Sequence, residues 1–214
     1  LIGIMAALGI CAAACQSKSA RTLPIYGQRQ AITRTIDGKT VTDTAYHTIP
    51  AYAFVNQYGD SITNKDLNGK IYVADFFFTS CPSICPVMHR NMLNVYHAFK
   101  NAADFKILSH SIDPKYDSVA VLKKYADKLG VTGNTWWFLQ GKKDATYKLA
   151  TSYLTTVAQD SAAAGGYVHQ GYFILIDKQE RIRGTYDGTQ PDQVKQVRAD
   201  RKTLRAEPDE SIAQ

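Results

Sequence analysis

The chain contains 214 residues, of which 45% are hydrophobic and 21% are charged, and its formal net charge at pH 7 is +6. This size is typical of one domain with extensions, and the composition is that of a soluble globular protein. No apolar run reaches the length of about 18 residues that marks a membrane-spanning helix.

The N-terminal run "LIGIMAALGICAAAC" is uncharged and predicts the apolar region of a secretion signal over residues 1–15. It ends in "AAAC" followed by polar residues, which resembles a bacterial lipoprotein signal in which Cys15 becomes lipidated. Ala12 stands where a bulkier aliphatic residue is usual, so an ordinary signal or a retained membrane anchor is the alternative. We expect a membrane-anchored protein on the extracytoplasmic, periplasmic side of a bacterial cell envelope, with residues 16–24 as a polar tether.

Strand signals dominate the next part of the chain. Two β-rich runs around "DGK" predict a hairpin within residues 25–50, with residues 25–47 as an N-terminal extension. Residues 53–63 predict two short strands around a turn at 58–60. The nearly continuous apolar run "KIYVADFFF", residues 70–78, predicts a strand that is buried on both faces.

Helices and strands then alternate. Apolar residues at helical spacing in "CPVMHRNMLNVYHAF" predict a helix from Cys85, with Pro86 suited to its first turn. The later predictions are a strand at 105–113, a helix at 118–130, a strand at 134–141, a helix at 144–153, a hairpin at 172–188 and a helix at 191–204.

The last helix carries a basic cluster, "VRADRKTLR", at residues 197–205. A solvated helix face is the plainer interpretation, and attraction to an anionic membrane or an acidic partner is the alternative. Nucleic-acid binding is disfavoured, because the chain is predicted to be exported and contains no aromatic–basic motif. The order of elements predicts an α/β fold, thioredoxin-like, with a central mixed sheet flanked by helices over residues 48–205 and a tail at 206–214.

Four cysteines are present, and two of them lie in the predicted targeting segment. The other two, Cys81 and Cys85, are four residues apart at the predicted helix N-terminus, where a thiolate is favoured over a thiol. A disulfide across so short a loop would constrain the unfolded chain little, so a purely structural clip is disfavoured. Redox exchange and metal binding both need thiolates, and the local sequence does not choose between them.

Two thiolates form an incomplete metal site, and Cu(I) favours sulfur donors with an imidazole as a suitable third ligand. Of the five histidines, His89 lies one helical turn after Cys85 and would have to bend back to reach it. Met88 is a sulfur donor that fits the core-facing stripe. His169 lies in a glycine-containing loop that leads into a strand, where thioredoxins place a cis-proline facing their cysteines. This context favours His169 as the third ligand.

Three blocks, "DFFFTSCPSICPVM", "LSHSIDPKYDS" and "GGYVHQGYFILIDKQERIRGTYDG", resemble the Sco/SenC family of copper chaperones for cytochrome c oxidase assembly. The resemblance implies that Cys81, Cys85 and His169 bind copper as Cu(I) or Cu(II). It also implies a partner, the oxidase subunit that carries the binuclear copper centre. Another periplasmic copper donor or a thiol reductant is a further possible partner.

Two aspartates match the acidic positions of the middle block. Asp113 is interpreted as a turn residue before Pro114 or as a support for the metal site. Asp117 directly precedes Ser118 and is predicted to cap the following helix.

Two functions stay open from the sequence. One is a copper-binding chaperone, and the other is a thiol–disulfide oxidoreductase in which Cys81 and Cys85 form the redox couple that reduces the apo copper site. A peroxidase-like or redox-sensing role is weaker, because Phe78 stands where a peroxidatic motif needs threonine.

Overall fold

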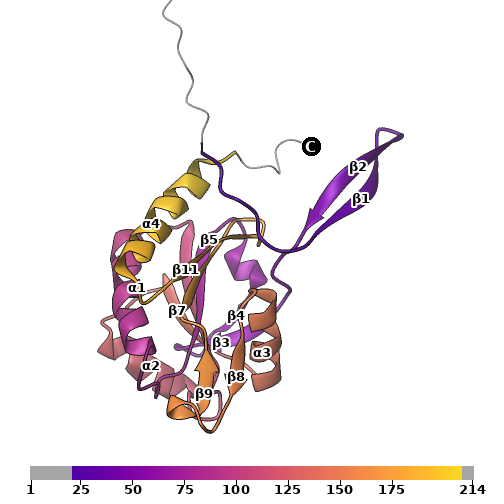
Figure 1. Ribbon diagram of the computed structural model, residues 1–214. Helices are drawn as coiled ribbons and strands as arrows, with labels where there is room; N and C mark the ends of the chain where they lie inside the picture. Colours follow the sequence, from indigo (N-terminus) through magenta and orange to yellow (C-terminus); the bar gives the residue numbers. More distant parts are fainter. Residues whose placement is uncertain (1–20, 209–214) are drawn as a thin grey trace, which may run out of the picture.

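The protein is described by a computed structural model that covers residues 21–208 (Figure 1). The predicted signal, Cys15 and most of the C-terminal tail therefore lie outside the described residues. Among the described residues, none of the helices has the length and hydrophobicity needed to cross a bilayer.

A seven-stranded mixed sheet forms the centre of the molecule, in the order β11-β10-β5-β6-β7-β3-β4. Strands β5, β6 and β7 run parallel, whereas β10 and β3 join them antiparallel. The strands are β3 (Ala53–Asn56), β4 (Ser61–Thr63), β5 (Ile71–Phe77), β6 (Phe105–Ser111), β7 (Trp136–Gln140), β10 (Tyr172–Ile176) and β11 (Ile182–Asp187). This arrangement confirms the predicted central mixed sheet.

Helices cover both faces of this sheet. They are α1 (Cys85–Phe99), α2 (Val119–Lys128), α3 (Lys143–Ser152) and α4 (Pro191–Ala206), with short 3-10 turns η1 (Asn64–Leu67) and η2 (Ala164–Gly166). Figure 1 shows α1 and α4 on one side of the sheet and α3 on the other. The predicted helices all exist, and their ends differ from the prediction by at most two residues.

The central strand β5 is buried at every position, as its sequence predicts. Alternate side chains point to opposite faces, so Phe77 packs against the α1 and α2 side while Phe76 packs against Tyr153 at the end of α3. Burial on both faces explains why the strand reads as a continuous apolar run. The chain that follows β5 therefore lies at the C-terminal end of the parallel strands, where α1 begins.

The predicted N-terminal hairpin is present as β1 (Arg29–Ile36) and β2 (Lys39–Tyr46). Asp37 and Gly38 join the two strands, and both have positive φ angles of 51° and 75°. These angles are those of the two-residue turn that the Asp-Gly sequence predicts. The hairpin projects away from the body of the molecule (Figure 1).

A second small hairpin was not predicted. Strands β8 (Val157–Gln159) and β9 (Tyr167–His169) pair antiparallel, and His169 is the last residue of β9. The sequence predicts a glycine-containing loop here, which is wrong for residues 167–169. Strands of three residues are too short to show an alternating pattern, and the glycines beside them favour a loop prediction.

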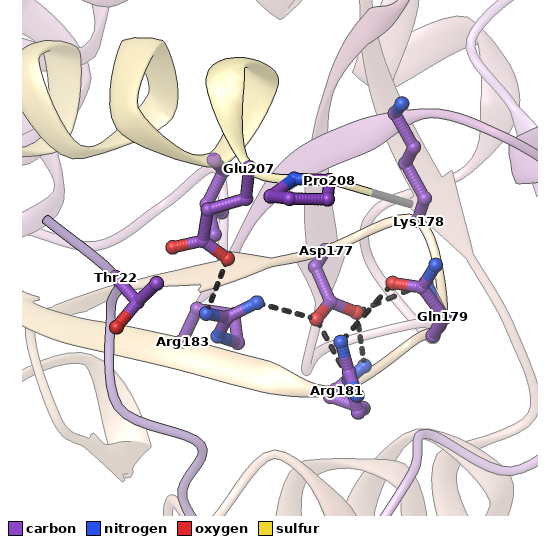
Figure 2. Close-up of a pocket in the computed structure, with 9 residues that line it drawn as sticks. Thr22, Asp177, Lys178, Gln179, Arg181, Arg183, Glu207 and Pro208 are labelled. Carbon is purple, nitrogen blue, oxygen red and sulfur yellow. Dashed lines mark hydrogen bonds and ion pairs between the residues drawn. The ribbon is translucent and has the colours of Figure 1, made fainter. Parts of the chain in front are cut away.

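A cluster of charged side chains fastens the segment before β1 to the rest of the fold (Figure 2). Arg183 on β11 donates to the carbonyl oxygens of Leu23 and Pro24, and it forms ion pairs with Asp177 and Glu207 at 2.9 and 2.6 Å. Asp177, Arg183 and Glu207 line a pocket of about 230 Å³. The cluster fixes where the N-terminal segment leaves the domain.

Candidate metal centre

Cys81 and Cys85 lie between the end of β5 and the start of α1. Cys85 is the first residue of α1, and Pro86 follows it at a position where a missing N–H removes no helical hydrogen bond. Cys81 lies in the preceding loop, where its N–H donates to the carbonyl oxygen of Phe78 at 3.2 Å. Both cysteines are buried and free, with 7% and 1% of their surface exposed. The strand–loop–helix order therefore brings both sulfurs to one point.

His169, the last residue of β9, directs its imidazole toward these sulfurs. Its Nε2 atom lies 3.2 Å from the sulfur of Cys85. The two sulfurs and one imidazole nitrogen all lie within 4.8 Å of one another. The ring of Phe78 packs edge-on against the imidazole at a centroid distance of 5.9 Å, which helps to hold its orientation. The structure thus brings together the three residues that the sequence selects as ligands.

The two thiols differ in charge although they are neighbours. A hydrogen bond from the Cys85 thiol lowers the pKa of Cys81 to about 3, and the lowering exceeds the opposite effect of burial. The same hydrogen bond and burial raise the pKa of Cys85 above its ordinary value. The reduced pair therefore carries one thiolate, on Cys81, and one proton, on Cys85.

Asp117 does not cap helix α2, and that prediction is wrong. The N-cap is Ser118, whose side chain accepts from the N–H of Val121 at 3.4 Å. Asp117 is buried instead, and it accepts from the N–H of Thr79 at 3.1 Å, from the Thr79 hydroxyl and from the Ser111 hydroxyl at 2.6 Å. Thr79 lies two residues before Cys81, so Asp117 positions the loop that carries this cysteine.

Asp113 contacts neither cysteine. Its carbonyl oxygen accepts from the N–H groups of Tyr116 and Asp117, as expected of a turn residue. Burial and a hydrogen bond to Asp113 raise the pKa of Tyr167 to about 12. Tyr167 begins β9, and its ring packs on Phe78 at 5.1 Å. Any support that Asp113 gives the site therefore passes through the strand that carries His169.

The other four histidines have different surroundings. His89 is fully buried and bonds Asp75 at 2.9 Å and the Tyr125 hydroxyl at 2.8 Å, so its ring is occupied away from the thiols. His110 is fully buried on the opposite face, with neither ring nitrogen bonded within the described residues. His47 bonds a backbone carbonyl, and His97 is exposed on α1.

The sequence does not predict the buried polar group of Asp75, His89 and Tyr125, which lies in the core near Cys85. Asp75 accepts from His89 and from the Ser109 hydroxyl, and Tyr125 completes the group through His89. A carboxylate in the middle of the apolar run of β5 was a readable signal, because a buried charge requires a partner. Tyr125 gave no signal, since tyrosine fits an amphipathic helix without a special role.

The donor set suits a soft metal ion. Two sulfurs and one imidazole nitrogen can form a trigonal set, and thiolate donors favour Cu(I). A structural zinc site would need a fourth protein ligand. Among residues 21–208, Cys81, Cys85 and His169 form a group of three side chains placed closely enough to hold one metal ion. Its chemistry fits copper better than zinc.

Comparison with known proteins gives matches over most of the chain. The family model SCO1/SenC matches residues 40–204. A SCO1/SenC family lipoprotein from Bacillus anthracis superposes with a TM-score of 0.67 and 29% identity, over 74% of this chain and 95% of that one. BsSco, a member of the Sco family of cytochrome c oxidase assembly proteins in which a disulfide switch was identified, gives 0.66 and 26%, over 76% and 95%.

A third solved structure, Bradyrhizobium japonicum ScoI with copper bound, has a TM-score of 0.62 and 24% identity, over 73% of this chain and 99% of that one. At this identity the likeness concerns the fold.

Proposed function

The chain belongs to the SCO1/SenC family, and on that premise we propose that it is a membrane-anchored, extracytoplasmic copper chaperone. It binds copper through Cys81, Cys85 and His169 and delivers it to the binuclear copper centre of cytochrome c oxidase. The observation that carries this proposal is the convergence of two sulfurs and one imidazole nitrogen within 4.8 Å.

The protonation of the site suits the capture of a cation. The thiolate of Cys81 offers a negative charge before copper arrives, and the Cys85 proton leaves when copper binds. A three-coordinate ion leaves room for a ligand from the acceptor protein, so copper can pass on by exchange of one ligand at a time. The buried position of both cysteines limits access of water to the bound ion.

The relatives support the proposed location and partner. The Bacillus anthracis relative is a lipoprotein, and the predicted lipoprotein signal ending at Cys15 supports the same kind of anchor here. BsSco belongs to a family of cytochrome c oxidase assembly proteins, which supports the oxidase subunit with the binuclear copper centre as the acceptor. Copper bound to ScoI supports the choice of metal.

A second function rests on the low pKa of Cys81. Its thiolate can attack a disulfide in the apo oxidase subunit and form a mixed disulfide, while one acceptor sulfur leaves as a thiolate. Cys85 then loses its proton and attacks Cys81, which releases the second acceptor thiol and leaves a Cys81–Cys85 disulfide. The substrate gains two electrons and the pair loses two. The disulfide switch described for BsSco supports this alternative.

The decisive residue is His169, because a dithiol reductase does not need an imidazole ligand. We expect His169→Ala to weaken copper binding to the reduced protein by more than the ~10–100-fold typical of losing an outer-shell partner. Competition with a copper chelator measures the affinity, and X-ray absorption reports the nitrogen ligand. His97→Ala, on the exposed face of α1, is the matched control and should bind as the wild type does.

Unchanged affinity and an unchanged ligand spectrum in His169→Ala would remove the third ligand from the proposal. Oxidase assembly in cells then separates the two functions. Cys81→Ser and Cys85→Ser should abolish assembly under either one, whereas His169→Ala should abolish it only if copper transfer is the role.

A further inference from the structure

The β1–β2 hairpin has no partner strand in the described part of the chain. Its two strands pair only with each other, and they form a sheet separate from the central one. Apart from Ile32, Ala45 and Tyr46, every residue of both strands is exposed. An isolated two-stranded hairpin is marginally stable in water, and its free edges are templates for a further strand. The hairpin is therefore built in a way that favours association.

The turn determines which backbone groups of β2 are free. Ile36 and Lys39 close the two-residue turn and form the first hydrogen-bonded pair of the ladder. Hydrogen-bonded and non-hydrogen-bonded pairs alternate from there, so Lys39, Val41 and Asp43 direct their N–H and C=O groups toward β1. Thr40 and Thr42 direct theirs outward, along the free edge of β2.

The sequence of this edge is self-complementary. Around Val41 it reads Lys39-Thr40-Val41-Thr42-Asp43, with opposite charges at equal distances from the centre. An antiparallel two-fold pairing centred on Val41 places Lys39 opposite Asp43 of the second copy, and the reverse. Asp43 also pairs with Arg34 of its own hairpin at 3.1 Å, so in the dimer its carboxylate would lie between Arg34 and Lys39 of the second copy. It also places Thr40 opposite Thr42, which makes the two outward-facing residues a hydrogen-bonded pair. Val41 meets its own copy where side chains come closest.

The threonines extend this match across the hairpin. Within one chain Thr42 is opposite Thr33, and Thr40 is opposite Thr35, on the same face. The two-fold pairing joins these pairs into two rows of four threonines across four strands. Cross-strand threonine pairs of this kind stabilise a sheet.

The free edge of β1 is less suitable. A two-fold pairing centred on Thr33 would place Ile32 opposite Arg34, with no charge pair to match that of β2. Arg29 at the start of β1 is also occupied, since it donates to the carbonyl oxygen of Ile25 and lies over the ring of Tyr46.

We propose that β2 pairs antiparallel with β2 of a second copy of this chain, and that the two hairpins form one four-stranded sheet. Strand β1, the turn and Lys39 lie outside residues 40–204 that match the family model, whereas the rest of β2 lies within them. The hairpin projects at the end of the molecule away from β9 (Figure 1), so the dimer leaves both candidate metal centres open.

Two charge reversals test the register. Lys39→Asp puts like charges on both sides of Val41, as does Asp43→Lys, and each variant alone should lose the dimer. We expect a rise of roughly tenfold or more in the dimer dissociation constant, because two favourable pairs become repulsive. Mixing the two variants in equal amounts restores both opposite-charge pairs, so the mixture should regain a dimer that contains one of each. Sedimentation velocity of the full chain in a mild detergent measures this, with one variant fluorescently labelled.

Restored pairing in the mixture excludes misfolding as the cause of the loss. Thr42→Pro provides a second test, since it removes an outward N–H from the β2 edge and no hydrogen bond to β1. It should abolish the dimer, whereas Thr33→Pro, the same change at the facing residue on the β1 edge, should not. A monomeric wild type, or a dimer that survives both charge reversals and Thr42→Pro, would overturn the proposal.

Discussion

Two buried polar clusters in this protein differ in how their polar atoms are satisfied. In the cluster of Figure 2, the guanidinium of Arg183 bonds two carbonyl oxygens and two carboxylates, and its positive charge is balanced. In the Cys81–Cys85–His169 group, the sulfurs and the imidazole bond mainly to one another. The Nδ1 atom of His169 is buried and has no bonding partner within residues 21–208.

This difference separates a structural cluster from a binding site. A buried group whose partners are all supplied by the chain gains nothing from a ligand, whereas converging donors with few other partners gain from an ion. Figure 2 shows charged groups around a pocket, yet these groups form hydrogen bonds and ion pairs with one another and with the backbone. Converging donors with few other partners, and not the presence of a pocket, mark the candidate site.

The largest expected effect is on the structural cluster. Arg183→Met removes the buried cation and leaves Glu207 and the carbonyl oxygens of Leu23 and Pro24 without this donor. Breaking a buried pair in this way typically lowers the free energy of unfolding by about 3–5 kcal/mol. Urea denaturation measures the loss, and copper affinity should stay at the wild-type value.

Arg198→Met is the matched control for that experiment, because Arg198 is exposed on the same side of the fold, on α4. It should change the free energy of unfolding little. Weakened copper binding in the folded Arg183→Met protein would show that the two clusters are coupled.

A smaller loss of stability is expected at Asp117, which has both a structural role and a role near the candidate metal centre. Its carboxylate is satisfied by the chain, and it positions the loop of the candidate ligand Cys81. Asp117→Asn replaces one acceptor oxygen by an N–H₂ donor, so a hydrogen bond from Thr79 or Ser111 is lost. We expect a loss of about 1–3 kcal/mol in the free energy of unfolding.

Copper affinity should fall in the same variant, by the ~10–100-fold typical of outer-shell changes. Chelator competition and urea denaturation give the two values. Asp127→Asn is the control, since Asp127 is exposed on α2 and pairs with the neighbouring Lys123. If Asp117→Asn loses stability but binds copper as the wild type does, then the Thr79 contact does not position Cys81 for the metal.

The sequence predicts those parts of the site that local patterns specify. Cys81 and Cys85 stand out by their spacing at a helix start, and the Asp-Gly pair predicts the hairpin turn. His169 could be selected because the order of elements places its segment opposite the cysteines. The role of Asp117 could not be predicted, because its partners Thr79 and Ser111 lie at the ends of β5 and β6 and are distant in sequence or separated from it by a turn. The position of Asp117 just before a helix also made a capping role the simpler prediction.

The same limit applies to the buried histidines. Nothing in the local sequence distinguishes His89, which has two partners, from His110, which has none among the described residues. The alternation of side chains along β5 and β6 and the packing of α1 decide this difference. Long-range contacts of this kind can be assigned only once the register of the strands and the packing of the helix are known.

The smallest expected effect concerns the charge that the site holds before copper binds. Each charge in the Arg183 cluster faces an opposite charge, whereas the Cys81 thiolate has a thiol as its main partner. The pKa of Cys81 lies below its ordinary value, so its contribution to stability is present above the ordinary pKa and is lost as the pH falls through about 3. The ultraviolet absorbance of the reduced protein should therefore show one thiolate that persists from neutral pH down to about pH 4.

Cys81→Ser should remove this thiolate signal, and any absorbance change from the cysteines of the N-terminal segment is common to both proteins. Cys85→Ser is the sharper variant, because a serine hydroxyl donates a hydrogen bond to Cys81 from a different distance. The pKa of Cys81 should then shift measurably, and in Cys85→Ala, which has no donor, it should rise toward the ordinary value. A Cys81 pKa that is the same in wild type and Cys85→Ala would mean that the helix N-terminus, and not the second thiol, stabilises the thiolate. The site would then hold its charge by the same kind of fixed compensation as the Arg183 cluster does.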